Sequence, residues 1–276
     1  IKYLFEGKIV MNFWEIFLYA FIQGVTEFLP ISSSAHLFLL ENIFNWPVSG
    51  RTMAIAAHLG TLIAVIFFLK KDINKIFTSL NKVKDHKIDK NIIFLRNLII
   101  ITMPVLIIGL LIFKNLDKQL LLLNVVAWSS LIGGILLYIS DKYRNQERDI
   151  YSLSILDSLF IGFFQIFALI PGASRAGCII TASRILKLKR IDATKLGLYS
   201  GIPTIAGAVI LEFFWIINNA LNKQEFLFTI IISILSFIFA YLSILFLIRW
   251  LQNYTFIPFV VYRITIGITL LYLVNT

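Results

Sequence analysis

Residues 23–36 read Gln23-Gly-Val-Thr-Glu27-Phe-Leu-Pro30-Ile-Ser-Ser33-Ser-Ala-His36, and residues 170–177 read Ile170-Pro171-Gly-Ala-Ser174-Arg175-Ala-Gly177. Each stretch interrupts an apolar segment, 13–43 in the first case and 153–186 in the second. Proline and small residues break a helix, and each remaining half is too short to cross a bilayer comfortably. Backbone groups freed inside a membrane must be satisfied within protein or a wet cavity. We therefore predict that both segments are re-entrant helix–loop–helix hairpins.

The composition of the whole chain supports a membrane setting. Of the 276 residues, 59% are apolar and only 14% are charged, whereas about a quarter of a typical soluble domain is charged. So few polar residues cannot cover the surface of a soluble globule, and so apolar a chain does not stay disordered. The lone Cys178 excludes a disulfide scaffold. The chain is predicted to be an all-α polytopic membrane protein.

Six further segments are long and apolar enough to cross a bilayer, which takes about 20 residues. They are separated by polar connectors, and the longest connector, 70–91, is rich in lysine. We expect the first apolar segment, 13–31, to stay in the mature chain because it lacks a small-residue cleavage site. The six predicted crossings are 52–69, 92–113, 120–140, 196–217, 227–248 and 257–274.

The two interrupted segments resemble each other. Gln23 precedes Pro30 by seven residues, and Gln165 precedes Pro171 by six. Downstream, the stretch that starts at His58 echoes the one that starts at Ile202. We infer a single membrane domain, 1–276, made of two repeats, 11–140 and 152–274. Each repeat has one hairpin and three crossings, so the second must be inverted, an arrangement that places interrupted helices face to face near the midplane.

The net charge of +10, from 25 Lys and Arg against 15 Asp and Glu, reports orientation. If connector 70–91 is cytoplasmic, then 141–151, 187–195 and the segment after 248 are too, and together they hold 15 of the 25 basic residues. Cytoplasmic loops carry such an excess. No nucleic-acid partner is needed to explain the charge.

Several polar residues lie inside the interrupted segments, where ionisable groups are costly and often functional. Gln23 and Glu27 are four residues apart and share a helix face. An arginine, free backbone N–H groups at helix breaks and a serine run favour phosphate chemistry. The remaining candidates are Ser32, Ser33, Ser34, His36, Ser174, Arg175 and Thr181.

These side chains suggest definite roles. Glu27 is a candidate general base or cation ligand, His36 a candidate proton shuttle, and Ser33 a candidate nucleophile on phosphorus. Taken singly, each also fits a structural role: serines bond the preceding turn, Glu27 pairs with Arg175, and His36 is a satisfied buried histidine. Their convergence at two helix breaks favours chemistry.

Three further polar residues lie inside predicted crossings, and for them we favour structural roles. They are His58, Glu212 and Arg263. Arg263 either pairs with Glu212 or extends its guanidinium to the membrane interface. The sequence contains no Walker, Rossmann, zinc or haem motif.

Over nearly its whole length the chain resembles the undecaprenyl-diphosphate phosphatases, also called the bacitracin-resistance proteins. Residues 23–36 look like the first motif of that family and residues 171–181 like the second. The resemblance implies an enzyme of the bacterial plasma (inner) membrane that hydrolyses undecaprenyl diphosphate to undecaprenyl phosphate and inorganic phosphate, recycling the lipid carrier for peptidoglycan synthesis. The chain departs from the family pattern at Ala176, where a serine is usual.

Residue by residue, the resemblance implies catalytic roles for Glu27, Ser33, His36 and Arg175. It also implies a divalent cation, Mg²⁺ or Ca²⁺, near Glu27 and Gln23, although the uncharged Gln23 argues against two carboxylates on one metal. The expected partners are the polyprenyl diphosphate and the bilayer, with a homodimer permitted by packed small residues. The residues expected to bind substrate are Gln23, Ser32, Ser34, Gly172, Ser174 and Thr181.

Two other classes of protein stay open at this point. Inverted repeats with broken helices are typical of secondary transporters and flippases, and a fold alone does not settle function. A structural membrane scaffold is the third possibility, but it leaves an intramembrane arginine and glutamate without a role.

Overall fold

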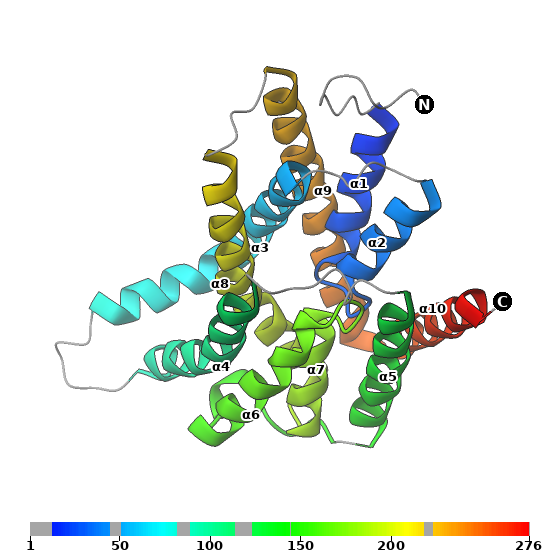
Figure 1. The fold of residues 1–276 in the computed structure, drawn as a ribbon. Coiled ribbons are helices and arrows are strands. Elements are labelled where there is room, and N and C mark those ends of the chain that lie inside the picture. Colours follow the sequence, from blue (N-terminus) through cyan, green and yellow to red (C-terminus); the bar gives the residue numbers. More distant parts are fainter. Residues whose placement is uncertain are drawn as a thin grey trace, which may run out of the picture.

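The computed structural model describes residues 13–44, 51–81, 89–113, 123–143, 145–217 and 223–275. Within these ranges the chain forms ten α-helices, two 3-10 helices and one isolated β-bridge between Arg148 and Leu188. The all-α prediction is therefore confirmed for the described residues. Figure 1 shows the helices gathered around a centre where the blue and green connecting turns meet.

The helices follow one another in two similar series. The first series is α1 (Phe13–Thr26), α2 (Ser33–Phe44), α3 (Arg51–Asn81), α4 (Lys90–Phe113) and α5 (Leu123–Lys142). The second is η3 (Ile150–Ser152), α6 (Ile155–Gln165), η4 (Ile166–Leu169), α7 (Arg175–Ile185), α8 (Arg190–Ile217), α9 (Lys223–Asn253) and α10 (Ile257–Asn275).

Six helices are long and apolar enough to cross a membrane, as predicted. They are α3, α4, α5, α8, α9 and α10, and their spans match the predicted crossings in number and order. Many of their large apolar side chains face outward, among them Leu111, Trp128 and Ile234. The chain is a multi-pass membrane protein.

The prediction that residues 70–91 form a connector between two helices was wrong for residues 70–81. Residues 70–81 continue α3, which runs for 31 residues to Asn81; the connector's residues 82–88 lie outside the described residues, as do residues 120–122 of the third predicted crossing. Lysine is a good helix former, so its charge does not end a helix. A 31-residue helix rises about 46 Å, whereas the hydrocarbon core is about 30 Å thick, so the lysine-rich end of α3 can extend beyond the bilayer.

Both predicted interruptions are present. The first lies between α1 and α2 and the second between η4 and α7. We call residues 27–32 the first break and residues 170–174 the second break. Three of their residues have positive φ, with values of 71° at Ser32, 91° at Gly172 and 69° at Ser174. Glycine is required at 172 because a Cβ there would also lie 2.7 Å from the carbonyl oxygen of Val126.

Packing between the two series brings the breaks together. In Figure 1, α9 lies along α1 and α3, and α10 lies against α5. In the same way α4 packs on α6, and α7 packs between α5 and α8. The two breaks therefore meet inside the bundle, enclosed by helices from both halves of the chain.

Candidate active site

Glu27 is the first residue of the first break, and three side chains donate hydrogen bonds to its carboxylate. Gln23 Nε2 and Ser33 Oγ each donate to Glu27 Oε2 at 2.8 Å. Arg175 Nη2 donates to Oε1 at 3.0 Å. The backbone N–H of Glu27 still donates to the carbonyl of Gln23 at 3.0 Å, so the two side chains share one face of the last helical turn, and the short break folds Ser33 back onto the carboxylate. Both carboxylate oxygens thus have partners, as a buried charge requires.

Arg175 comes from the second break, which makes the site a joint product of the two halves. It is the first residue of α7, and its side chain is 14% exposed, against 7% for Glu27. Its second terminal nitrogen, Nη1, donates to the carbonyl of Gly197 in α8 at 3.0 Å. The guanidinium is thereby held at a fixed angle, and its charge is balanced by Glu27.

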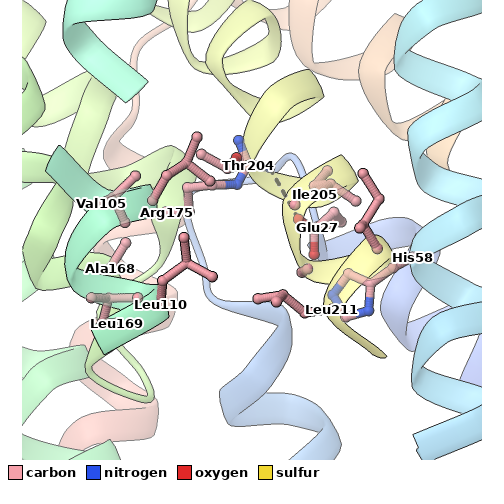
Figure 2. Close-up of a pocket in the computed structure, with 15 residues that line it drawn as sticks. Glu27, His58, Val105, Leu110, Ala168, Leu169, Arg175, Thr204, Ile205 and Leu211 are labelled. Carbon is pink, nitrogen blue, oxygen red and sulfur yellow. Dashed lines mark hydrogen bonds and ion pairs between the residues drawn. The ribbon is translucent and has the colours of Figure 1, made fainter. Parts of the chain in front are cut away.

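A cavity of about 540 Å³ opens beside this ion pair. Figure 2 shows Glu27 and Arg175 at its polar end, with apolar side chains of α4, η4 and α8 forming the remaining wall. Such a volume is in the range of small-molecule sites, which are mostly apolar with a few polar groups. Its apolar lining includes Val105, Leu106, Leu110, Ala168, Leu169, Ile205, Ala208 and Leu211. The cavity suits a ligand with a charged head and a hydrocarbon tail.

Two residues of the polar end were not predicted as site residues. His58 of α3 and Thr204 of α8 both line the cavity. The Nδ1 of His58 lies 2.7 Å from the carbonyl oxygen of Ala54 and must donate to it, since a carbonyl only accepts. In the neutral ring Nε2 is then the acceptor. His58 was expected to be structural; its sequence signal was a polar residue inside a crossing, but nothing in the sequence indicated which way it faces.

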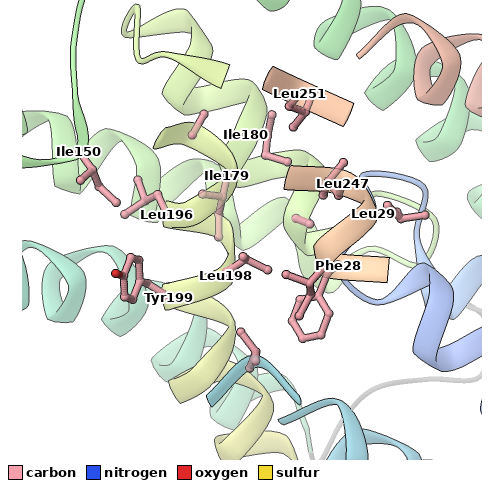
Figure 3. Close-up of a cluster of buried hydrophobic side chains, with 14 of the residues drawn as sticks. Phe28, Leu29, Ile150, Ile179, Ile180, Leu196, Leu198, Tyr199, Leu247 and Leu251 are labelled. Atoms are coloured by element: carbon pink, nitrogen blue, oxygen red, sulfur yellow. The ribbon is translucent and has the colours of Figure 1, made fainter. Parts of the chain in front are cut away.

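The residues that follow Glu27 fix the first break in the main apolar core. Phe28 and Leu29 are 1% and 7% exposed. Figure 3 shows them beside Leu247 of α9, with Ile179 and Ile180 of α7 and Leu196 and Leu198 of α8 in the same cluster. Between membrane helices such side chains stabilise through close van der Waals packing. The position of Glu27 is therefore set by packing on both halves of the chain.

His36 makes its hydrogen bonds to other groups than Glu27 and the three side chains that donate to it. Its Nδ1 donates to the carbonyl of Ser32 at 2.6 Å, and its Nε2 lies 2.6 Å from the hydroxyl of Tyr262 in α10. Because Nδ1 carries the proton, the Tyr262 hydroxyl donates to Nε2 in the neutral ring. His36 stands one helical turn after Ser33, with both ring nitrogens bonded.

The remaining predicted binding residues are spread around the two breaks. Ser32 and Ser34 bond each other, with 3.1 Å between their hydroxyl oxygens. Ser174 caps α7 by accepting from the backbone N–H of Gly177 at 3.1 Å, and Gly172 presents its carbonyl to Arg263. Thr181 is buried beside a second cavity of about 720 Å³ between α5, α6 and α7, away from the Glu27 cavity.

Arg263 is fully inside the protein and does not extend to the membrane interface, which corrects that expectation. It is 2% exposed and donates to backbone carbonyls in both breaks. The side chain of Glu212, its other predicted partner, lies outside the described residues. The guanidinium of Arg263 therefore does not extend to the membrane interface, and it binds backbone carbonyls inside the protein.

The fit of a divalent cation rests on two oxygen-bearing side chains. Among the described residues, no three His, Cys, Asp or Glu side chains are grouped to hold a metal by themselves. Gln23, however, is fully buried, and its Oε1 has no hydrogen-bond donor. Mg²⁺ is commonly held by one or two protein oxygens together with substrate phosphates. A cation held here would need Glu27 and the free Gln23 oxygen together with oxygens of a phosphorylated ligand, because the Glu27 carboxylate already accepts three hydrogen bonds.

Comparison with known proteins identifies the family of this chain. The family model of the bacitracin resistance protein BacA matches residues 16–269. The undecaprenyl-diphosphatase of Pelagibacter ubique is 37% identical over 263 residues, which cover 94% of this chain and 96% of that protein. Those of Alcanivorax borkumensis and Jannaschia sp. are 35% and 36% identical, each over 95% of this chain and 99% and 98% of their own lengths. Because the family model matches residues 16–269, which include both helix breaks, the chain belongs to the bacitracin resistance protein BacA family.

Proposed function

We propose that this protein hydrolyses undecaprenyl diphosphate to undecaprenyl phosphate and inorganic phosphate in the bacterial plasma membrane. The observation that carries the proposal is the contact of Ser33 and Arg175 with one carboxylate, that of Glu27, at the polar end of an apolar cavity. Family membership and the names of full-length relatives support it. The product is the recycled lipid carrier for peptidoglycan synthesis, and its regeneration gives bacitracin resistance.

The architecture proposed for this enzyme is a single domain with two re-entrant hairpins. The repeats are 11–140 and 152–274, the second inverted relative to the first. The meeting of the two breaks inside the bundle supports this arrangement. So does the matched pair Gln23 and Gln165, both 0% exposed and each preceding a break. A homodimer is a further prediction, and light scattering of the purified protein would measure its mass.

Binding of the diphosphate begins with a change of partner. In the structure Arg175 is paired with Glu27, and a diphosphate entering the polar end competes for the guanidinium. Arginine binds phosphate oxygens with two parallel donors. Hydrogen bonds from Arg175 to the phosphate therefore replace the one that it makes to Glu27. The backbone at the N-terminus of α7 adds N–H donors, which favour an anion. Ser32, Ser34, Gly172 and Ser174 complete the proposed binding surroundings, whereas Thr181 lines the second cavity and is not placed at this site.

The chemical step follows from the Ser33–Glu27 hydrogen bond. Ser33 Oγ attacks the terminal phosphorus while its proton passes to Glu27. The bond from that phosphorus to the bridging oxygen breaks, and undecaprenyl phosphate leaves with the bond's electron pair. The leaving undecaprenyl phosphate takes that proton, so Glu27 is a carboxylate again. Water then attacks the phosphoserine and gives a proton to Glu27. The bond between phosphorus and Ser33 Oγ breaks, inorganic phosphate leaves, and Glu27 returns the proton to Ser33. In a variant of this path Glu27 activates water directly and Ser33 only orients the phosphate.

His36 and a cation have supporting roles in this proposal. His36, one turn from Ser33, provides the proton transfer that assists departure of the leaving group and hydrolysis. A Mg²⁺ or Ca²⁺ ion would be held by Glu27 and Gln23 and would supply charge neutralisation on the phosphates. Phosphoryl transfer depends chiefly on such positioning and charge balance.

The test is release of phosphate from undecaprenyl diphosphate by purified protein in detergent, with Mg²⁺ or Ca²⁺. We expect turnover by the wild type, loss of it in Arg175→Ala, and a trapped phosphoserine at 33 under acid quench. Full activity of Ser33→Ala would overturn the nucleophile role and leave the activated-water path. If the wild type releases no phosphate, the proposed enzyme function fails.

The same assay separates the enzyme from a flippase, which the broken helices would also suit. A flippase moves its lipid between leaflets and releases no phosphate in detergent. Movement of the lipid across vesicles without any phosphate release would favour the flippase.

A further inference from the structure

Arg263 is a buried cation that the chemistry proposed above does not use. It lies on α10 and is 2% exposed. Its Nη1 donates to the carbonyl of Pro30 in the first break at 3.4 Å. Its Nη2 donates to the carbonyls of Gly172 and Ala173 in the second break, at 3.1 and 2.9 Å, and to that of Ser129 in α5 at 3.2 Å. One guanidinium thus bonds both breaks at once.

The need for such a bond comes from the breaks themselves. Where a helix is interrupted, carbonyls lose their intrahelical partners, and inside a membrane protein another group must satisfy them. None of the ion pairs among the described residues includes Arg263. Its charge is therefore balanced by these carbonyl dipoles. The buried guanidinium needs the carbonyls of the two breaks, and those carbonyls need the guanidinium as a donor.

Two glycines make a slot for the guanidinium. A Cβ on Gly177 of α7 would lie 2.7 Å from Arg263 Nη1, and a Cβ on Gly133 of α5 would be closer still to Nη2. The planar group thus lies between α5 and α7, where no larger side chain than glycine fits on either wall. A lysine ammonium lacks the fork needed to reach carbonyls on opposite sides.

The neighbouring residue on α10 contacts the other arm of the first hairpin. Tyr262 bonds His36 of α2, and their rings are stacked with centroids 5.5 Å apart. Two consecutive residues of α10 therefore bind α2, the first break and the second break.

We propose that Arg263 is a positioning residue that holds the two breaks in register, so that Glu27 of one meets Arg175 of the other. Pro30 lies three residues after Glu27, and Ala173 lies two residues before Arg175, so the bonded carbonyls flank the ion pair on both chain segments. This role rests on the proposed phosphatase function for its effect on turnover. Displacement of catalytic groups by about 1 Å can cost a hundredfold in rate.

The experiment compares three variants of the full chain in detergent. Arg263→Lys keeps the charge and loses the fork. Gly133→Ala keeps Arg263 and pushes its guanidinium with one methyl group. Arg184→Lys is the matched control, because Arg184 is also fully buried. It lies at the end of α7 far from Arg175 and bonds Asp141 of α5.

Turnover gives the first readout. We expect kcat per folded molecule to fall roughly tenfold to a hundredfold in Arg263→Lys and Gly133→Ala, with KM changed less than about threefold. Arg184→Lys should lower the melting temperature and leave kcat near the wild-type value. A kcat within about twofold of wild type in a folded Arg263→Lys or Gly133→Ala protein would overturn the proposal.

A second readout needs no substrate. Melting temperatures of Glu27→Gln, Arg175→Met and the double variant give the coupling between those two residues. The coupling should be present in the wild-type background and lost in the Gly133→Ala background. Unchanged coupling contradicts the positioning role, whereas absence of turnover in the wild type contradicts only the proposed function.

Discussion

At the scale of single residues, the site rests on one carboxylate whose oxygens are all engaged. Glu27 accepts from Gln23, Ser33 and Arg175. Its ion pair with Arg175 is buried, so the pair is held by geometry more than by net attraction, and removal of either partner leaves an uncompensated charge. This makes Glu27 important to both stability and chemistry.

Glu27→Gln is predicted to damage both properties. Turnover should fall by roughly a hundredfold or more because the proposed base is lost. Stability should fall by about 3 kcal/mol because Arg175 stays buried and charged without its carboxylate partner. Phosphate release and thermal unfolding of the same preparation measure the two effects.

Asp157→Asn is the matched control for that variant. It breaks the pair of Asp157 with Arg148, which are 2.6 Å apart and partly exposed outside the six spans. Turnover should be unchanged, and the stability loss should be smaller, about 1–2 kcal/mol, since the change affects one partly exposed pair and the capping box that Asp157 forms with Ser154. Equal turnover in Glu27→Gln and wild type would remove Glu27 from the mechanism.

Sequence patterns identify the residues that meet, but they do not orient all of them. Gln23, Glu27 and Ser33 are predicted and lie together, because the i, i+4 spacing and the first break fix them locally. Arg175 is also predicted, but it joins them from the second break. His58 was expected to be structural, yet it lines the cavity. The face that a buried polar side chain presents depends on how α3 packs, and hydropathy does not report it.

At the scale of helices, composition predicts the spans well and their ends poorly. All six crossings are found from composition, because a run of about 20 apolar residues is hard to place anywhere but in a bilayer. The end of α3 was missed by 12 residues, counted from 69 to Asn81. Charge ends a membrane span but not a helix, so the two boundaries need not coincide.

The start of α4 carries a pH-dependent cap. Asp89 accepts from Ser79 Oγ at 2.6 Å and from the backbone N–H of Asn91 at 2.9 Å. The Ser79 hydrogen bond and then the Asn91 backbone N–H lower the pKa of Asp89 below its usual range. A lowered folded-state pKa means stability that is present above the unfolded pKa, about 4, and is lost as pH falls through the folded value.

Asp89→Asn is expected to remove that acid-side loss. The wild type should lose melting temperature below about pH 4, and the variant should show a shallower slope over the same range. Thermal scans in detergent between about pH 3 and 6 measure it. Identical slopes would mean that the cap is not formed.

The cavity wall made by α4, η4 and α8 is predicted to bind the hydrocarbon tail of the lipid substrate. Ala208 lines it, so Ala208→Phe should raise KM for undecaprenyl diphosphate by roughly tenfold and affect a short-chain prenyl diphosphate much less. Ile139→Phe, at an outward-facing position of α5, is the control and should change neither. A similar rise for both chain lengths would place the tail elsewhere.

At the scale of the whole molecule, the site exists only because two halves of the chain meet. Each break can be predicted locally from proline and small residues. Their contact, and the guanidinium of Arg263 that bonds both, depends on residues more than 140 positions apart, such as Glu27 and Arg175. The predicted repeat indicates that the breaks face each other, but no local pattern indicates that Arg263 of α10 bonds both of them.

The orientation in the membrane is predicted by the basic residues. Lys75→Cys, in the lysine-rich end of α3, should react with a membrane-impermeant thiol reagent only when the cytoplasmic side is exposed. Lys223→Cys should react from the opposite side. Cys178 is buried, so the native thiol gives a low background. Reversed labelling would invert the topology.

The apolar cavity beside the buried ion pair has a kinetic consequence. A lipid whose tail occupies the wall of α4 and α8 need not enter water, so substrate and product exchange by lateral diffusion. The quantity that sets the rate is then the mole fraction of the lipid in the membrane plane, not its amount per volume of solution. Added inert lipid acts as a diluent and slows turnover at constant total substrate, and other long-chain isoprenoid lipids become competitors by sharing the same two-dimensional pool.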